Sequence, residues 1–471
     1  MAQGLPNRSL QVLFMNGMPG SVLAAREAPE GAGGTNVMGY RLAMFVWFLF
    51  LFEPARLAAY YIPALFPLRW LPTFMLLLAF VYWIAAAREK YNYGLFAAVL
   101  VVNLAGTAVA YFGGNWGIAR EINRQILQFF LLGLITFSFV DSKERMAGLF
   151  GMYFWHILYF ALWGLLSLKI EPIDPSVDPG LRRIVFWHPW LDNRDGFGAL
   201  MVIGIAFSWH YLQAAAGLWK RSAVAACMLL CLSGVVMSFG RGVFLATVVT
   251  AIFILFQSKK KAAGMVLLAL SAAAVFGISA FISPENMYWE KMSTIESGMS
   301  AGTGADRKYL WSWAWREFLD NPLLGVGTGN YGIAALEIVT EEEMIKAGYT
   351  RGRLWGRALH CAPLTVLCEY GLIGTLVFVL FVTGFIRTNR SSRRKFEVFD
   401  KFRTRKEGTR PGLLFYCQSG LMAAFVAFWV NGIFYEIIYA PFLWNIAVLN
   451  RLICIENLER KEAAPSLSSA A

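Results

Sequence analysis

Long apolar blocks alternate with short polar segments along most of the chain. Each block has the roughly 17–25 residues that an α-helix needs to cross a bilayer. The blocks lie near 41–66, 70–87, 92–112, 124–141, 146–169, 195–214, 221–239, 241–257, 262–282, 362–386, 411–432 and 434–453. The first is interrupted by Glu53, Pro54 and Arg56, which predicts a broken helix or a span with an interfacial piece. The pattern therefore predicts an all-α integral membrane protein of about twelve transmembrane helices, with one long loop between spans nine and ten.

The composition agrees with insertion into a membrane. Of the 471 residues, 58% are hydrophobic and 15% are charged, whereas soluble domains carry about 25% charged residues. The net charge of +12 is concentrated in clusters between apolar blocks, such as Lys259–Lys261 and Arg387–Arg410. Lys and Arg resist export, so these clusters indicate cytoplasmic loops rather than a nucleic-acid surface. The six cysteines form no CxxC pair, which supports neither a disulfide framework nor a metal site.

The charged flanks also divide the chain between compartments. The positive-inside rule places both termini in the cytoplasm and two loops outside, a shorter one near 170–194 and a much longer one. The predicted parts are a flexible cytoplasmic leader (1–40), spans one to nine (41–282), the long periplasmic loop (283–361), spans ten to twelve (362–453) and a cytoplasmic tail (454–471).

The long outer loop carries cations that topology does not explain. Long loops escape the positive-inside bias, so these side chains indicate either anion binding or a solvated surface. They include Arg307, Arg316, Arg351, Arg353 and Arg357. The loop is also rich in tryptophan, which suits a surface at the lipid headgroups; these residues are Trp289, Trp311, Trp313, Trp315 and Trp355. The stretch 307–320 predicts an amphipathic helix that ends at Asn321-Pro322.

Two arginines occupy positions that suit an anionic ligand. Arg241 lies between two glycines at an outer helix start, where the structural alternative is a side chain that snorkels to the interface. Arg307 begins the amphipathic helix, where a cation opposes the helix dipole unless an anion is bound; an exposed helix-start charge is the alternative. The planar guanidinium group suits a pyrophosphate because it forms paired, charge-assisted hydrogen bonds.

His360 and Glu369 are the candidate proton-transfer groups. A histidine titrates near neutral pH and suits a base that takes a proton from a hydroxyl, although a lone histidine is more often structural. Glu369 falls inside a span, where an ionisable group is a functional candidate; orienting a partner and being neutral both remain open. The segment 324–332 contains a formal GxGxxG without a βαβ context, so it predicts a glycine-rich turn rather than a dinucleotide site.

In combination these motifs resemble the O-antigen ligase and polymerase family of bacterial membrane glycosyltransferases. The shared patterns are Ser-x-x-Arg-Gly (Ser238–Gly242), Gly-x-x-Arg-x-x-x-Trp (Gly304–Trp311) and Asn-Pro-Leu-Leu-Gly-Val-Gly-x-Gly-Asn (Asn321–Asn330). They are followed by a histidine (His360) and by Glu-x-Gly-Leu-Ile-Gly (Glu369–Gly374). The resemblance covers about 195–385. It implies an enzyme of the bacterial inner membrane that acts in polysaccharide biosynthesis of the cell envelope, in lipopolysaccharide or exopolysaccharide.

The resemblance also implies a role for the matched residues. Arg241 and Arg307 would bind the pyrophosphate of a polyprenyl-linked glycan donor, and His360 would act as the base on an acceptor hydroxyl of a lipid A core, a growing polysaccharide or a similar acceptor. No metal, nucleotide or other cofactor is implied. Supporting roles fall to Glu369 and Asn330, and charge and location add Arg353 and Arg357. The family usually has Asn after the histidine; Cys361 stands here, which puts the choice of acceptor in question.

Three alternatives stay open on the sequence. Within the enzyme class, the motifs do not separate a ligase from a polymerase, and we slightly favour a ligase. A transporter or flippase of lipid-linked sugars would also suit many spans and outer cations, although the chain shows no paired half-repeats. The third alternative is a non-catalytic scaffold of an envelope assembly. The sugar, the acceptor and the oligomeric state are not specified by the sequence.

Overall fold

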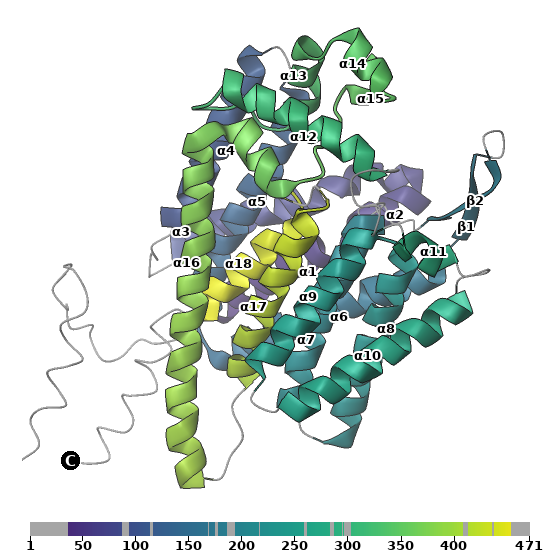
Figure 1. Ribbon diagram of the computed structural model, residues 1–471. Coiled ribbons are helices and arrows are strands. Elements are labelled where there is room, and N and C mark those ends of the chain that lie inside the picture. Colours follow the sequence, from purple (N-terminus) through teal and green to yellow (C-terminus); the bar gives the residue numbers. More distant parts are fainter. Residues whose placement is uncertain are drawn as a thin grey trace, which may run out of the picture. The chain divides into compact units, whose positions relative to one another are not determined.

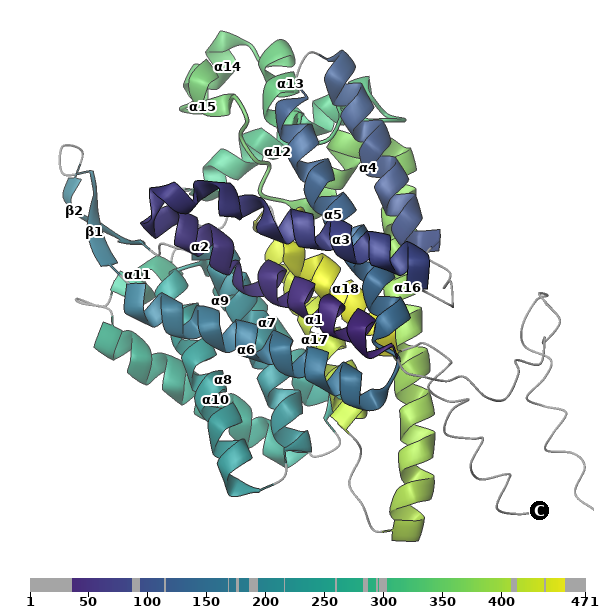
Figure 2. The ribbon, with the colours of Figure 1, turned by 180° about the vertical axis from the view of Figure 1, so that it is seen from behind.

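The computed structural model describes most of the chain between residues 36 and 453 (Figures 1 and 2). The described ranges are 36–86, 94–113, 116–167, 169–174, 178–185, 194–215, 217–258, 261–282, 287–293, 295, 303–407, 413–435 and 438–453. The architecture below is that of the unit Met38–Ala471. The predicted tail and most of the predicted leader lie outside the described residues.

Helices dominate the described part of the chain. The elements are α1 (Val37–Phe52), α2 (Pro54–Tyr61), the 3-10 helix η1 (Pro63–Trp70), α3 (Leu71–Ala86), α4 (Gly94–Phe112), α5 (Gly117–Phe139), α6 (Lys143–Ser167), β1 (Lys169–Asp174), β2 (Asp178–Val185), α7 (Arg194–Ala214), α8 (Leu218–Ser238), α9 (Arg241–Gln257), α10 (Lys261–Ile282), α11 (Met287–Ser293), α12 (Thr303–Asp320), α13 (Tyr331–Ile338), α14 (Glu341–Lys346), α15 (Arg351–Leu354), α16 (Ala362–Glu407), α17 (Leu413–Gly432) and α18 (Pro441–Ile453). Helix α1 begins inside the predicted leader.

Each of the predicted apolar blocks contains a helix, but fewer helices qualify as spans by themselves. Among the described residues, 7 helices are long and apolar enough to cross a membrane, or up to 8 if α1 and α2, bent by 45°, form one broken span. Shorter apolar helices occur at Phe96–Phe112, Arg241–Gln257 and Gly264–Ala280. The chain is therefore a multi-pass membrane protein, and the count of twelve spans stays a prediction.

The centre of the bundle is built around α7. Every residue of α7 from Gly196 to His210 is buried, and this helix packs against α8, α9 and α17. A helix that is apolar all round belongs in the middle of a bundle rather than at its lipid-facing surface. Helix α7 thereby fixes the positions of the helices whose ends carry the candidate site.

The shorter outer loop differs from the all-α prediction. Strands β1 and β2 pair antiparallel, with Lys169 opposite Val185 and Asp174 opposite Asp178. The pattern of apolar blocks identifies only segments long enough to span a membrane. A short hairpin between two such blocks does not appear in this pattern, so no strand is predicted here.

The long outer loop is folded around a small apolar core of its own. Helices α12, α13, α14 and α15 lie together at one end of the bundle in both views (Figures 1 and 2). Their core includes Leu310, Trp313, Tyr331, Met344 and Leu354, all buried. The predicted amphipathic helix is confirmed: α12 contains 307–320 and ends at Asp320, before Asn321-Pro322.

One expectation for this loop needs correction, and for one of its cations the structure favours the solvated alternative. Trp313 is only 2% exposed and packs inside the loop core, and Trp311 donates its Nε1–H to the carbonyl of Leu359. The tryptophans are thus not one headgroup surface, although Trp315 and Trp355 are exposed. Arg316 forms an exposed ion pair with Glu343, at 3.0 Å from Nη1 to Oε1. A structural partner therefore accounts for this cation, although such a pair contributes little stability.

Helix α16 is broken inside its apolar part. Gly371 has φ 62° and ψ −160°, far from helical values. A break frees backbone groups that must find partners within the protein, because lipid offers none. The glycine-rich segment 322–328 supplies them through four backbone hydrogen bonds: Val326 to Cys368 (3.0 Å), Gly327 to Glu369 (3.0 Å), Leu372 to Pro322 (2.8 Å) and Ile373 to Leu323 (3.3 Å). We call this arrangement the filled break.

Glycine is required on both sides of the filled break. Gly325 has φ 70°, and a Cβ there would overlap the carbonyl of Cys368. A Cβ on Gly371 would overlap the carbonyl of Leu323. Only glycine combines a positive φ with such a close backbone approach. The predicted glycine-rich turn is therefore an inserted segment that links the folded outer loop to a membrane helix.

Candidate functional site

Arg241 lies at the junction of two consecutive helices. Helix α8 ends at Ser238 and is capped by Phe239, whose φ is 48°, and α9 begins at Arg241 itself. The hydroxyl of Ser238 accepts the backbone N–H of Gly240 at 3.2 Å, which satisfies one donor at the start of α9. A Cβ on Gly240 would lie 2.8 Å from an oxygen of Asp195. The tight turn thus brings Arg241 beside the start of α7.

The glycines around Arg241 make room for protein rather than for ligand. Gly240 lies against Asp195, and a Cβ on Gly242 would lie 2.6 Å from the Cβ of Phe434. Glycines beside an arginine can also let a bulky ligand approach the backbone closely, which is how the sequence alone would explain them. The structure replaces that interpretation: they allow α9 to pack closely against α7 and against the connection that follows α17.

Arg307 reaches the same connection from the outer loop. Its Nη2 donates a hydrogen bond to the carbonyl of Phe434 at 2.8 Å. Burial lowers the pKa of Arg307; Asp195 opposes the shift, whereas the like charge of Arg241 adds to it. A guanidinium group stays charged despite such a shift. Arg241 and Arg307 are therefore within electrostatic range of each other, with one carboxylate nearby.

His360 completes the cluster. It has φ 55°, a left-handed conformation that is costly for a residue other than glycine. Its ring stacks on Tyr435, with centroids 5.8 Å apart and planes at 26°. Within the described residues, its buried Nδ1 has no hydrogen-bond partner. Burial, then the charges of Arg357 and Arg307, lower the pKa of His360 to about 4.

The low pKa has a direct chemical meaning. With a pKa of about 4, the imidazole of His360 is neutral at neutral pH. A neutral imidazole can accept a proton, whereas an imidazolium cannot. The cluster thus combines a proton acceptor with Arg241, Arg307 and Arg357. This combination can bind an anion and remove a proton from a hydroxyl beside it.

Three other predicted residues lie outside this cluster. Arg353 is exposed and donates to the carbonyl of Gly348 at 3.1 Å. Asn330 precedes α13 and donates its Nδ2 to the carbonyl of Val326 at 2.8 Å. Glu369 lies in the filled break, where its Oε2 accepts the N–H of Gly329 at 2.7 Å. Of the supporting residues, only Arg357 is coupled to His360 by charge.

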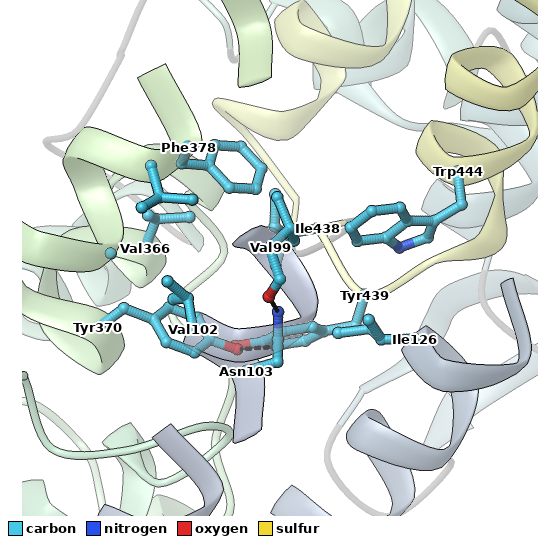
Figure 3. A pocket seen from close by; sticks show the side chains of 12 residues that line it. Val99, Val102, Asn103, Ile126, Val366, Tyr370, Phe378, Ile438, Tyr439 and Trp444 are labelled. Carbon is cyan, nitrogen blue, oxygen red and sulfur yellow. Dashed lines mark hydrogen bonds between the residues drawn. The ribbon is translucent and has the colours of Figure 1, made fainter. Parts of the chain in front are cut away.

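Glu369 begins a chain of polar groups in the membrane part of the bundle. Tyr439 donates its hydroxyl to Glu369 in a short hydrogen bond, and the hydroxyls of Tyr370 and Tyr439 are 3.3 Å apart. Tyr370 also donates to Oδ1 of Asn103 at 2.6 Å. Figure 3 shows Tyr370, Tyr439 and Asn103 converging at one small, mostly apolar cavity. This chain ties together the filled break, α4 and the connection between α17 and α18.

Sequence reasoning missed several residues of the site. Asp195, Phe434 and Tyr435 contribute a charge, a carbonyl and a ring, and nothing in the local pattern marks them. Tyr439 and Asn103 could have been noticed, because polar groups inside apolar blocks are costly and need partners. Within the described residues, no group of three or more His, Cys, Asp or Glu side chains is placed to bind a metal ion.

The fold and the site define a multi-pass membrane protein with an arginine–histidine cluster where its outer loop meets the helix ends. Residues 226–379 match the family model described as O-antigen ligase. The matched segment runs from α8 into α16 and includes Arg241, Arg307 and His360. Proteins of this family are membrane glycosyltransferases of the ligase type that act in polysaccharide and lipopolysaccharide biosynthesis. No curated protein matches the chain.

Proposed function

We propose that the protein transfers a glycan from a polyprenyl-pyrophosphate carrier to an acceptor hydroxyl at the periplasmic face of the bacterial inner membrane. The observation that carries the proposal is the convergence of Arg241, Arg307 and His360 from three separate elements. The match to the O-antigen ligase family over 226–379 supports the reaction class. Both termini would then be cytoplasmic, as the positive-inside rule predicts.

In the proposed reaction, the pyrophosphate of the donor binds to Arg241 and Arg307. The oxygen of the acceptor hydroxyl attacks the anomeric carbon of the glycan, and its proton passes to the imidazole of His360. The bond from the anomeric carbon to the pyrophosphate breaks, and its electron pair leaves with the pyrophosphate oxygen. Negative charge therefore grows on the leaving group, where the arginines stabilise the transition state more than the ground state.

The charges of the cluster couple donor binding to base strength. Arg357 and Arg307 help to lower the pKa of His360. A bound pyrophosphate would offset their positive charge, so the pKa of His360 would rise towards neutrality. Base catalysis is most efficient when the pKa lies near the working pH. In this proposal the donor itself makes His360 a stronger base, and an empty site holds a weak one.

The acceptor is expected to be a lipid A core or a comparable glycan, which makes the enzyme a ligase rather than a polymerase. The family description favours the ligase. Cys361 follows His360, and its charge interaction with Arg307 indicates that it lies beside the arginine. A thiol offers weaker hydrogen bonds than the amide that the family usually has here. The acceptor preference would differ accordingly.

The decisive test uses the purified chain in lipid nanodiscs with a polyprenyl-pyrophosphate glycan and a lipid A core acceptor. Release of polyprenyl pyrophosphate and formation of the conjugate are both measured. His360→Ala should lower the rate by about 10²–10⁴-fold, and Arg307→Ala by about 10²-fold or more. Arg351→Ala, an exposed arginine of the same loop, is the matched control and should retain the wild-type rate.

The same assay separates transfer from transport. If neither product forms with the wild-type protein, while donor moves between the leaflets of protein-containing vesicles, the chain is a flippase. If His360→Ala retains the wild-type rate, the histidine is structural and another base operates. Loss of activity in both variants, with normal folding, is the result that the proposal expects.

A further inference from the structure

A second cluster of arginines lines a cavity away from His360. The cavity lies where α1 and α2 meet, against η1, the start of α3 and the outer part of α5. Its described lining includes Arg56, Arg69 and Arg124, with Glu53 as the one carboxylate among them. Three cations against one carboxylate leave the lining positive. None of these residues has a part in the proposed transfer, and the cavity lies outside the matched segment 226–379.

The arginines come from three different elements and are held in place independently. Arg56 pairs with Glu53 at 3.0 Å, and Arg124 forms an ion pair with Glu121. Arg69 is held by rings instead: its Cζ lies 3.8 Å from the ring centre of Phe66 and 5.2 Å from that of Trp70. Arg69 has no carboxylate partner among the described residues. Its charge is therefore available to a ligand.

One ring connects two of the guanidinium groups. Trp70 lies 5.2 Å from the Cζ of Arg69 and 5.6 Å from the Cζ of Arg124. Arg124 already donates its Nε–H and an Nη2–H to Glu121, so fewer of its donors remain for a ligand than those of Arg69. The two guanidinium groups nevertheless place two positive charges beside one ring, which suits an anion with several oxygens. Gln128 closes the side of the cavity, where its Nε2 donates to Thr73 at 2.8 Å.

The surroundings of the cavity are those of a membrane surface. Tyr60, Tyr61, Phe66 and Trp70 are large apolar or aromatic side chains that are 49–62% exposed. Aromatic residues of this kind gather at the level of lipid headgroups. Basic pockets between membrane helices recognise phosphorylated headgroups by charge-assisted hydrogen bonds. The cavity therefore has cations for a phosphate and an apolar rim for acyl chains.

We propose that the cavity lined by Arg56, Arg69 and Arg124 binds the phosphate of a membrane lipid. Pro441, the first residue of α18, lines the cavity, and Phe434, which accepts the hydrogen bond of Arg307, lies in the connection that leads from α17 to α18. The inference does not depend on glycosyl transfer, because it concerns binding alone.

The test measures lipid binding to the purified full chain in a neutral detergent. The probes are dioctanoyl phosphatidic acid, dioctanoyl phosphatidylcholine and inorganic phosphate. The wild-type protein should bind phosphatidic acid more tightly than phosphatidylcholine. Arg69→Gln removes one charged donor and should weaken the binding of phosphatidic acid by about fivefold to tenfold. Arg124→Gln should have a comparable effect, and it serves as a second variant of the same cavity.

Arg120→Gln is the matched control. Arg120 lies one turn before Arg124 on α5, is exposed, and stacks over Trp116 at 4.7 Å without lining the cavity. Its replacement removes the same charge and should leave the affinity within twofold. Equal affinity in Arg69→Gln and the wild type overturns the proposal. So does an equal loss in Arg120→Gln, because the effect would then be one of general charge.

Inorganic phosphate identifies the source of the anion. If it displaces phosphatidic acid in a manner that depends on Arg69, the site recognises a phosphate without requiring acyl chains. If it does not, the lipid headgroup with its chains is the ligand. Either result supports a phosphate site. Arg307→Ala should retain lipid binding while losing transfer, so failure of this site and failure of the proposed enzyme give different results.

Discussion

Two interruptions of apolar helices, one in α16 and one between α1 and α2, solve the same physical problem in different ways. At Gly371 the chain inserts the segment 322–328, whose backbone satisfies the freed groups. At Glu53 the backbone needs no insertion: its carbonyl accepts the N–H groups of Arg56 and Leu57 at 3.0 Å, and Pro54 has no N–H to satisfy. We call this second interruption the open break. The space beside it is a cavity lined by arginines.

The difference shows how a break in a membrane helix becomes either a support or a binding site. The filled break has glycines with positive φ in tightly packed positions. The open break has a glutamate in the left-handed region, with φ 44°, and charged side chains around it. Changes at the filled break should therefore act on stability and geometry, and changes at the open break on affinity.

The largest effect is expected from Gly371→Ala. The new Cβ would overlap the carbonyl of Leu323, and φ is 62°, so the segment 322–328 must move out. The loss should be about 3 kcal/mol or more of unfolding free energy, measured as a lowered melting temperature in detergent. Gly151→Ala in α6, where a Cβ meets nothing within 4 Å, is the control and should not lower it. A Gly371→Ala protein with unchanged melting would show that the filled break is not a structural support.

The second effect concerns pH. The folded pKa of His360 is lowered to about 4, so the free enzyme keeps a neutral base above that pH. The value of kcat/KM should fall tenfold per pH unit below about pH 4. Arg357→Gln removes a positive charge that lowers this pKa, so the acidic limb should move upward. Arg351→Gln should leave it in place, as should Arg69→Gln at the open break. An acidic limb that does not respond to Arg357→Gln would exclude His360 as its origin.

A smaller effect is expected from Tyr439→Phe. The variant removes the hydroxyl that donates to Glu369 and leaves a buried carboxyl group with one partner fewer. The cost should be about 1–3 kcal/mol of stability, detected by thermal unfolding. Tyr61→Phe, 62% exposed at the other break, should be neutral. Equal stability of the two variants would argue that the polar chain around Glu369 is incidental.

The smallest effect belongs to the open break. Glu53→Gln keeps the shape of the side chain and removes the only carboxylate that lines the cavity within the described residues. The affinity for phosphatidic acid should rise by about twofold to fivefold, as a repulsive charge is lost. Transfer activity should not change. Weaker binding in this variant would mean that Glu53 holds Arg56 in its productive position through their ion pair.

Much of the architecture was accessible from the sequence because it rests on local patterns. Apolar blocks of spanning length gave the positions of the helices, and the amphipathic pattern of 307–320 gave α12. The interruption at Glu53 and Pro54 was visible for the same reason. The motif order placed Arg241, Arg307 and His360 on the outer side, and the structure brings these three residues together with Arg357.

The remaining features depend on contacts between distant segments. No local pattern shows that 322–328 bonds to the backbone of α16, or that Tyr439 donates to Glu369 across 70 positions of sequence. The cavity of the open break needs arginines from α2, η1 and α5, which are dispersed over three segments. In the sequence, each of these arginines is a separate charge near the end of an apolar block. Only the packing of the helices brings the three arginines to one cavity.

The filled break also bears on the order in which the protein is assembled. The segment 322–328 leaves the ribosome before α16, and it lies in the loop that the sequence predicts to be exported. Until it folds back, α16 enters the bilayer with backbone groups at Cys368, Glu369, Leu372 and Ile373 that have no partners. Each such group is unfavourable in lipid. The insertion of α16 is therefore complete only when the outer loop has folded back onto it. If the loop is exported as predicted, assembly of the membrane helices from α16 onwards depends on that export.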